Sequence, residues 1–412
     1  MSEFLNLLPP GLALQRLLSA MPDAHPAVEA LRTSDALGRV AAEAVRSGED
    51  LPGFSRSTVD GYALRAGDTF GASDSLPAYL QLAGEVPMGG TPEFRLLPHQ
   101  AALVYTGGML PEGADAVVMV EHTQISRPGE LEILRAVARA ENILLAGEDA
   151  RRGDVILEVG TRIRPAEIGG LMALGILSLP VARKPRVGIL SSGDEVVPPE
   201  RAPQPGQVRD VNSYTLAALV QQAGAEPSVY GILPDRAELL EQALRSALAE
   251  CDLVVLTAGS SASARDLTSR AIDRAGAPGV LVHGVNVRPG KPTILAVCDG
   301  KPVIGLPGNP VSALVIAGLF VLPVIRKLTG ERGDRPVGKI TAKLSLNLAS
   351  QAGREDWVPV RLVDTGQGSL AEPIFYKSNL ILSLVRADGL ICIPPDATGL
   401  AAGDLVEVTI LE

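Results

Sequence analysis

Aromatic side chains are scarce in this chain of 412 residues: they make up 3% of it, with a single Trp. Hydrophobic residues still reach 46%, so Val, Leu, Ile and Ala must supply most of the core packing. Charged residues account for 20%, which is typical of a soluble globular protein. The chain is too long for one ordinary core, and we expect two to four domains.

Cysteine and histidine are also rare. The three cysteines, Cys251, Cys298 and Cys392, are odd in number and lack CxxC spacing, which fits the reducing cytoplasm. The four histidines form no cluster with metal-ligand spacing. The sequence therefore predicts a cytoplasmic protein without a metal site built on histidine or cysteine.

A net positive charge and long apolar runs are lacking too. The formal net charge of −10 argues against a general nucleic-acid binder, and an anionic substrate would need a local basic pocket. The most apolar run, residues 311–325, is shorter than the ~20 residues that span a bilayer, and Ser312 and Pro323 interrupt it. We expect a buried helix there, no membrane association and no signal peptide. A GxxxxGK[ST] loop and a GxSxG elbow are both absent from the sequence.

The first 180 residues predict two interleaved domains. Apolar spacing predicts helices at 11–20 and 28–45, and Pro165 opens a third that runs to about residue 177. Residues 1–45 and 145–180 would form one discontinuous helical and extended domain, either a dimerisation element or simple packing helices. Between them, residues 46–144 predict a β-rich inserted domain, with strands near 79–83, 101–105, 116–120 and 130–134.

The rest of the chain predicts two further domains. Residues 181–329 alternate strands and helices, as in a doubly wound α/β domain with helices on both faces of its sheet. Residues 330–412 predict an all-β unit, a small barrel or sandwich. The expected strands are 187–190, 227–232, 253–256, 280–282, 293–297, 302–305, 340–346, 356–362, 389–393 and 404–411, and the expected helices are 212–223, 236–249, 267–275 and 310–328.

Three junctions in the α/β region carry small residues where a strand meets a turn: 187–194, 253–261 and 301–312. The carboxyl ends of such strands meet at one sheet edge, where α/β proteins bind ligands. In the third junction, Asn309 suits an N-cap and Pro310 suits the first helical position. A helix start presents free N–H groups, so this edge favours a phosphate-like anion. Taken one at a time, such turns could simply connect the strands and helices of an α/β fold.

Charged side chains gather near the same predicted edge. Arg288 and Lys291 flank a turn made rigid by two prolines, where they could neutralise developing negative charge or form a solvated basic turn. The carboxylates suit Mg²⁺, which commonly takes one or two of them plus substrate phosphates. Any single one could equally be a surface or capping residue. The candidates are Asp194, Glu195, Asp235 and Asp266.

Taken together, the motifs resemble those of the molybdopterin molybdenumtransferases, the MoeA family, which is related to the gephyrin E domain. The resemblance runs along essentially the whole chain. It rests on Leu51-Pro-Gly-Phe54, Asp60-Gly-Tyr62, Thr106-Gly107, Pro111-Glu-Gly-Ala-Asp-Ala-Val-Val118, Gly147-Glu-Asp149, Ser192-Gly-Asp-Glu195, Pro289-Gly-Lys-Pro292 and Gly305-Leu-Pro-Gly-Asn-Pro-Val-Ser312.

The resemblance implies a cytoplasmic homodimer of four-domain subunits whose α/β domain resembles the molybdopterin adenylyltransferases. It implies that adenylylated molybdopterin and molybdate react with release of AMP, assisted by Mg²⁺. A molybdopterin adenylyltransferase and molybdoenzyme delivery proteins are the implied partners. Asp60 and Thr106 would reach the α/β domain of the other subunit.

The resemblance also assigns roles to residues. Asp60, Asp235, Asp266 and Arg288 would be catalytic, and Glu195, Asp235 and Asp266 would hold the metal. The implied substrate-binding residues are Thr106, Asp149, Ser191, Ser192, Gly193, Asp194, Thr257, Gly259, Ser260, Ser261, Lys291, Pro307, Gly308, Asn309 and Pro310.

Some positions depart from the family pattern. Arg288 stands where the family often has lysine, Gly284 replaces another lysine, and Ala258 and Ser263 replace two glycines of the third-strand loop. This pattern looks like a divergent branch. The alternatives are a tungstate-selective homologue, an adenylyltransferase-like activity, or a catalytically silent carrier of the pterin cofactor.

Overall fold

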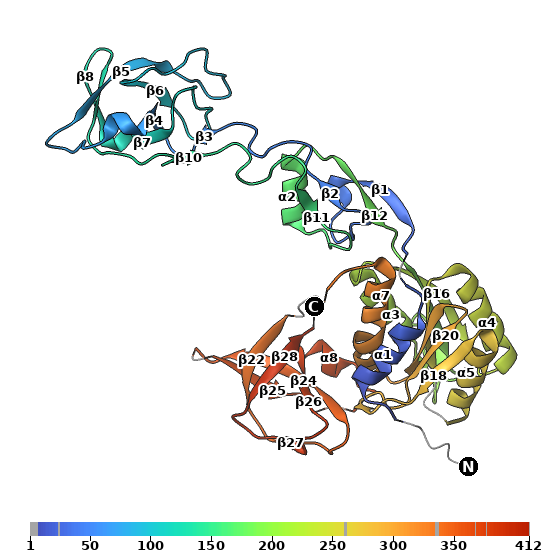
Figure 1. Cartoon of the computed structure of the whole chain (residues 1–412). Coiled ribbons are helices and arrows are strands. Elements are labelled where there is room, and N and C mark those ends of the chain that lie inside the picture. Colours follow the sequence, from blue (N-terminus) through green and yellow to red (C-terminus); the bar gives the residue numbers. More distant parts are fainter. Residues whose placement is uncertain are drawn as a thin grey trace.

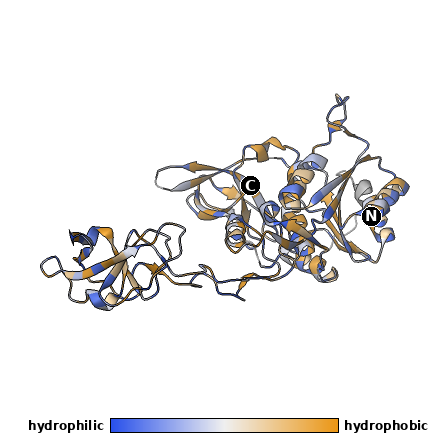
Figure 2. Cartoon of the chain, turned by 90° about the horizontal axis from the view of Figure 1, so that it is seen from above, coloured by the Kyte–Doolittle hydropathy of each residue, from blue (hydrophilic) through white to orange (hydrophobic). Residues whose placement is uncertain are grey.

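The computed structural model describes residues 7–23, 25–258, 262–333, 338–366, 368–375 and 377–411. Its parts follow one another along an elongated molecule (Figure 1). The β-rich module lies at one end, a small strand-rich domain connects it to the α/β domain, and the C-terminal barrel lies beside the α/β domain. The view turned by 90° shows the same narrow connection to the β-rich module (Figure 2).

The α/β domain is built on a six-stranded sheet in the order β16-β13-β17-β21-β20-β18. The first four strands are parallel to one another, whereas β20 runs antiparallel to both of its neighbours, β21 and β18. The six strands are β16 (Glu226–Leu233), β13 (Arg186–Ser192), β17 (Leu253–Ala258), β21 (Lys301–Pro307), β20 (Ile294–Cys298) and β18 (Pro278–His283).

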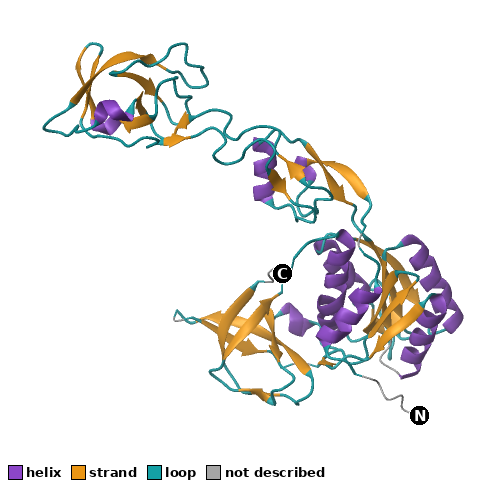
Figure 3. Ribbon diagram, viewed as in Figure 1, coloured by secondary structure: helices purple, strands orange, loops and turns teal. Residues whose placement is uncertain are grey.

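Helices cover both faces of this sheet, as the sequence predicts (Figure 3). One core cluster contains residues of α1, α3 and the long helix of α6 and α7, and the other contains residues of α4 and α5. The helices are α1 (Pro10–Ala20), α3 (Asn212–Gln222), α4 (Ala237–Glu250), α5 (Ala262–Ala275), α6 (Pro310–Ile316), a π-helical turn (Ala317–Val321) and α7 (Leu322–Thr329).

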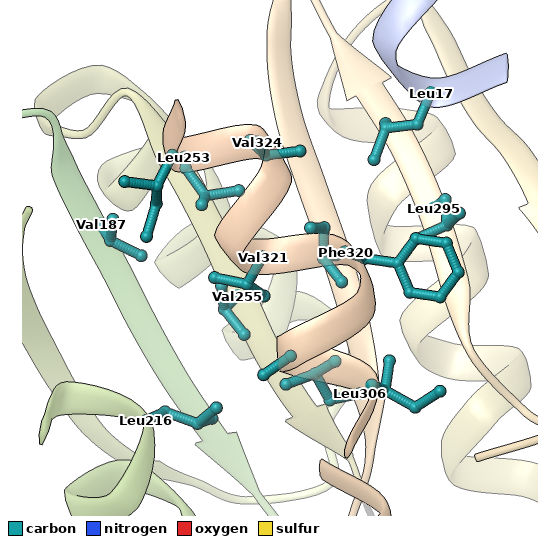
Figure 4. Packing of buried hydrophobic residues seen from close by; sticks show 14 of the residues in the cluster. Leu17, Val187, Leu216, Leu253, Val255, Leu295, Leu306, Phe320, Val321 and Val324 are labelled. Carbon is teal, nitrogen blue, oxygen red and sulfur yellow. The ribbon is translucent and has the colours of Figure 1, made fainter. Parts of the chain in front are cut away.

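The long helix is the centre of the larger core. Phe320, Val321 and Val324 are fully buried and face the sheet beside Val255 and Leu295 (Figure 4). Pro310–Thr329 is the one helix among the described residues that is apolar and long enough to cross a membrane, but about half of it is buried inside the protein. The apolar run is therefore a core helix, as the sequence predicts.

The N-terminal segment differs from the prediction. The helix expected at 28–45 is wrong: the chain forms β1 (Val28–Arg32), a short 3₁₀ turn (Thr33–Asp35) and β2 (Val45–Arg46). β1 pairs with β12 (Ser178–Ala182) and β2 with β11 (Val155–Leu157), so strand partners far along the chain override a weak helix preference.

The small domain contains those four strands together with α2 (Pro165–Ala173). The predicted helix start at Pro165 is confirmed, but the helix ends four residues before 177, and the chain returns as β12. Helix α1, expected in this domain, instead packs on the α/β sheet, where Ala13 and Leu17 are fully buried. The first domain boundary therefore lies after α1.

The β-rich module forms a six-stranded sheet in the order β7-β4-β6-β5-β9-β8, and all four predicted strands are present in it. β4 begins at Gly61, where only glycine fits because a Cβ would lie 2.0 Å from the carbonyl oxygen of Val118. The strands are β4 (Gly61–Leu64), β5 (Ala78–Glu85), β6 (Gln100–Val104), β7 (Ala116–Met119), β8 (Thr123–Arg127) and β9 (Glu130–Ile133). β3 (Arg56–Ser57) pairs with β10 (Ile143–Leu144) at its base, and two 3₁₀ turns (Ala66–Thr69, Val120–His122) complete it.

The C-terminal domain is a five-stranded barrel that closes through pairing of β24 with β26. A sixth strand, β19 (Val287–Arg288), comes from the α/β domain and pairs with β24. The barrel strands are β22 (Lys339–Leu344), β24 (Glu355–Asp364), β25 (Ser369–Pro373), β26 (Gly389–Ile393) and β28 (Leu405–Ile410). The short elements β14 (Val196–Val197), β15 (Val208–Arg209), β23 (Leu348–Ala349), β27 (Gly399–Leu400) and α8 (Leu382–Val385) complete the structure.

Candidate functional site

Three of the predicted strand ends meet at one edge of the α/β sheet. The parallel register places Ser191 beside Thr257, and Thr257 beside Leu306 of the Pro-Gly-Asn turn. The Ser191 and Thr257 side chains are buried, and the Thr257 hydroxyl donates to Ser191 Oγ at 3.4 Å. Gly259, Ser260 and Ser261 follow directly and lie outside the described residues.

An acidic corner forms at the ends of β13 and β16. The backbone N–H of Asp235 donates to Asp194 Oδ1 at 3.3 Å. Gly193, the residue before Asp194, has a positive φ of +147°. Burial raises the pKa of Asp235 above its ordinary value, and the negative charges of Asp194 and Glu195 raise it further. A hydrogen bond from Ser192 opposes that shift of the pKa. Negative charge is thus concentrated at this corner, and no cationic group is among the causes that shift the pKa of Asp235.

A pocket of about 720 Å³ opens next to this edge. Its wall includes four cationic residues, Arg288, Lys291, Arg354 and Lys377, and the described residues contribute no Asp or Glu to it. A pocket with this charge favours an anion, in spite of the negative net charge of the chain. The predicted residues Arg288, Lys291, Pro307, Gly308 and Asn309 all line it, whereas Asp266 is an exposed residue of α5 outside the described wall.

The basic turn is shaped by Gly290. This residue has a φ of +120°, and a Cβ there would lie 2.3 Å from Ile316 Cδ1 of α6, so only glycine fits. The hydroxyl of Thr293 donates to the Gly290 carbonyl oxygen at 2.6 Å. The turn is therefore packed tightly against the helix, and it holds Arg288 and Lys291 on either side.

The Pro-Gly-Asn turn is tied down from two sides. Asn212 Nδ2 of α3 donates to the Gly308 carbonyl oxygen at 2.8 Å, and Asn309 Nδ2 donates to Ser378 Oγ at 2.9 Å. Asn309 occupies the N-cap position and Pro310 the first turn, as predicted, but the Asn309 side chain does not cap the helix. The backbone N–H of Val311 donates to the Ser378 carbonyl oxygen at 3.1 Å. The free N–H groups expected at this helix start are thus partly used by the C-terminal domain.

The C-terminal domain supplies residues that the sequence motifs did not indicate. Arg354, Lys377 and Ser378 all line the pocket, and Arg354 and Arg288 both contact the buried carboxylate of Asp356. No strand-to-turn motif marks these positions. Their only signal in the sequence is basic or polar character in loops of the predicted barrel.

Asp60 and Thr106 come together, but far from the pocket. Thr106 donates its backbone N–H and its hydroxyl to Asp60 Oδ1, at 2.8 and 2.9 Å, and these hydrogen bonds lower the pKa of Asp60. Both residues are exposed in the β-rich module, which lies away from the α/β domain (Figure 1). Asp149 is exposed near the base of this module, where its N–H donates to the Leu51 carbonyl oxygen at 3.0 Å.

The carboxylates of the acidic corner are the candidate ligands for a metal ion. Among the described residues, no group of three or more His, Cys, Asp and Glu side chains could hold an ion on its own. Mg²⁺ usually takes only one or two carboxylates and completes its shell with phosphate and water. Asp235 and Asp194 fit that requirement, because the repulsion that raises the pKa of Asp235 would be relieved by a cation.

Comparisons with known proteins agree along the chain. Family models match residues 9–175 (MoeA N-terminal region, domain I and II), 188–327 (probable molybdopterin binding domain) and 341–411 (MoeA C-terminal region, domain IV). A putative molybdopterin biosynthesis protein of Methanocaldococcus jannaschii is 36% identical, over 96% of this chain and 95% of its own. The chain belongs to the MoeA family.

Other members of the MoeA family agree with this assignment. The molybdopterin molybdenumtransferase of Nostoc is 35% identical over 89% of this chain and 85% of its own. The crystal structure of the molybdopterin biosynthesis MoeA protein from Pyrococcus horikoshii OT3 has a TM-score of 0.85 and 33% identity, covering 98% of this chain and 100% of the other. As a member of the MoeA family, this protein is a transferase of molybdenum cofactor biosynthesis.

Proposed function

We propose that this protein inserts molybdate into adenylylated molybdopterin and releases AMP. The observation that carries the proposal is the pocket of about 720 Å³, whose described wall has four cationic residues and no carboxylate. It adjoins a sheet edge rich in hydroxyls. Both substrates are anions, and the reaction breaks a phosphoanhydride bond, so negative charge builds up as AMP leaves.

The cationic residues and the carboxylates of this chain would have different roles in the reaction. Arg288, Lys291 and Arg354 would bind the anions and offset the charge that develops on the leaving phosphate, a kind of preorganisation that commonly supplies several kcal/mol. Asp235 and Asp194 would hold Mg²⁺ together with the substrate phosphates. The ion would supply charge neutralisation at the phosphoanhydride.

We further propose a cytoplasmic homodimer with a shared site. The β-rich module, which carries Asp60 and Thr106, extends away from the α/β domain (Figure 1), so a second copy would have to bring these residues to the pocket. A molybdopterin adenylyltransferase would supply the substrate, and delivery proteins for molybdoenzymes would accept the product. Sedimentation equilibrium tests the dimer. Mixed dimers of Asp60→Ala and Lys291→Ala subunits test the sharing of the site. If the site is shared, one of the two sites in each mixed dimer keeps both residues and stays active, whereas unshared sites would both be damaged.

The deciding experiment is AMP release from adenylylated molybdopterin in Mg²⁺, with molybdate, with tungstate and with neither. Release that depends on molybdate supports the proposal. Preference for tungstate would identify a tungstate-selective homologue. Tight pterin binding without release under every condition would refute the transferase reaction and favour a carrier. In a further arm with free molybdopterin and ATP, formation of adenylylated molybdopterin with release of pyrophosphate would favour an adenylyltransferase-like activity.

A further inference from the structure

Asp356 is a buried carboxylate with three separate partners. Its side chain is 4% exposed. Arg354 donates from Nε to Oδ1 at 2.8 Å and from a terminal nitrogen to Oδ2 at 3.4 Å. The Ser350 hydroxyl donates to Oδ2 at 2.8 Å, and a terminal nitrogen of Arg288 donates to the same oxygen at 3.3 Å. One carboxylate therefore holds two guanidinium groups.

The two arginines come from different domains. Arg288 ends β19, which leaves the α/β domain and pairs in parallel with β24 of the barrel, so that Arg288 lies opposite Asp356 in the register. Arg354 belongs to the loop just before β24. Both arginines belong to the residues that line the anion pocket. The carboxylate is thus the common anchor at which the two halves of the pocket meet.

Asp356 also offsets positive charge at the pocket. Two neighbouring guanidinium groups repel each other, and no acid stands among the described residues that line the pocket. Asp356 offsets one charge from behind the wall and leaves the pocket cationic. The Arg288 side chain remains 60% exposed and makes a single contact of 3.3 Å with the carboxylate. A guanidinium has five N–H donors, so most of those on Arg288 stay available to an anion.

We propose that Asp356 is a positioning residue for the transferase reaction: it fixes the separation and direction of Arg288 and Arg354, which contact the anionic substrate. This inference rests on the proposed function, because that function makes the two arginines substrate contacts. The competing explanation is that Asp356 only joins the barrel to the α/β domain. The two explanations differ in what they predict for kcat and for anion binding.

The test compares Asp356→Asn with wild type and with Glu407→Gln. The latter is a matched acid-to-amide control in the same barrel, where Glu407 forms an exposed ion pair with Lys339. AMP release is measured against molybdate concentration. Molybdate alone is titrated by fluorescence of Trp357, the single tryptophan, which belongs to β24 of the barrel and packs against residues of α6. The rate at which phenylglyoxal modifies Arg288 is read by mass spectrometry.

For Asp356→Asn we expect kcat to fall on the order of tenfold or more, because a misplaced charge no longer meets the leaving phosphate. Molybdate should bind at least as tightly as in wild type, since one negative charge has been removed. Arg288 should react several-fold faster with phenylglyoxal, Asp356→Glu should recover part of kcat, and Glu407→Gln should match wild type throughout.

Unchanged kcat and unchanged Arg288 reactivity would overturn the inference. A loss of AMP release that disappears on normalising to the folded fraction would overturn it as well, in favour of a purely structural role. If wild type releases no AMP with either oxyanion, the proposed function fails separately. The Arg288 reactivity and the molybdate titration then still decide whether Asp356 holds the arginine.

Discussion

Thr106 donates two hydrogen bonds to a single oxygen of Asp60, from its backbone N–H at 2.8 Å and from its hydroxyl at 2.9 Å. Both bonds favour the ionised carboxylate, so the pKa of Asp60 is lowered even though the residue is exposed. The pair is a preformed anionic group on the surface of the β-rich module, held by a turn and by the start of β4.

Replacing the hydroxyl tests this pair. In Thr106→Val the backbone N–H remains and the hydroxyl is lost, so the pKa of Asp60 should rise but stay below its ordinary value. An NMR titration of ¹³C-labelled aspartate measures it. Because the wild-type pKa is lowered, the bonds contribute to stability above the unfolded pKa and lose that contribution as the pH falls. Thr123→Val, which removes a hydroxyl bonded within its own turn, is the control, and an unshifted Asp60 would contradict the prediction.

Asp235→Asn should separate stability from activity. The folded pKa of Asp235 is raised, so protonation stabilises the fold, and that contribution is lost as the pH rises through the folded pKa. The amide imitates the protonated acid, and we expect a higher Tm than wild type at pH 7. The difference should vanish at a pH below the unfolded value.

The same substitution should lower kcat for AMP release about a hundredfold, because a carboxylate that would organise charge is gone. Differential scanning calorimetry at several pH values gives the stability, with Asp74→Asn at an exposed turn as control. A variant that is less stable than wild type at neutral pH would show that Asp235 is not under electrostatic strain.

Gly290→Ala should damage the basic turn. The added Cβ would meet Ile316 Cδ1 at 2.3 Å, and Ile316 is fully buried, so overpacking should cost about 1–3 kcal/mol. Gly318→Ala, where nothing lies within 4 Å, should instead stabilise the helix by about 0.5–1 kcal/mol. Urea unfolding of both variants measures the contrast, and equal stabilities would argue against tight packing of the turn.

Arg162→Met should destabilise the junction between the small domain and the α/β domain. Arg162 makes two bonds to Glu331, at 2.8 and 2.9 Å, and others to the carbonyl oxygens of Gly38 and Ala223. The Glu331 side chain is 4% exposed, so removing its partner should cost about 3–5 kcal/mol.

A surface pair in the barrel is the matched control for Arg162→Met. Lys339→Met breaks an exposed ion pair with Glu407 and should change stability by less than about 1 kcal/mol. Denaturant unfolding gives both free energies. Similar small losses would mean that the Arg162 pair contributes no more than a surface pair.

Local patterns predicted the α/β domain well because they act over short distances. Alternating strands and helices marked its sheet, and small residues at three strand ends marked the edge where Ser191, Thr257 and Leu306 now lie side by side. By contrast, the helix predicted over 28–45 failed. The partner that makes Val28–Arg32 a strand lies about 150 residues later, in β12, beyond the reach of any periodicity.

The sequence by itself determined the composition of the core, the strand-end motifs and the family, because these depend on residues close together in the chain. Only the tertiary structure decided which residues of the barrel complete the pocket. β19 joins the barrel, so Arg288 meets Asp356, and Asn309 meets Ser378, across sequence separations of 68 and 69 residues. It also decided that Asp60 lies far from that pocket, since the β-rich module extends away from the α/β domain (Figure 1). Contacts between domains depend on how folded units dock, and no local pattern encodes that.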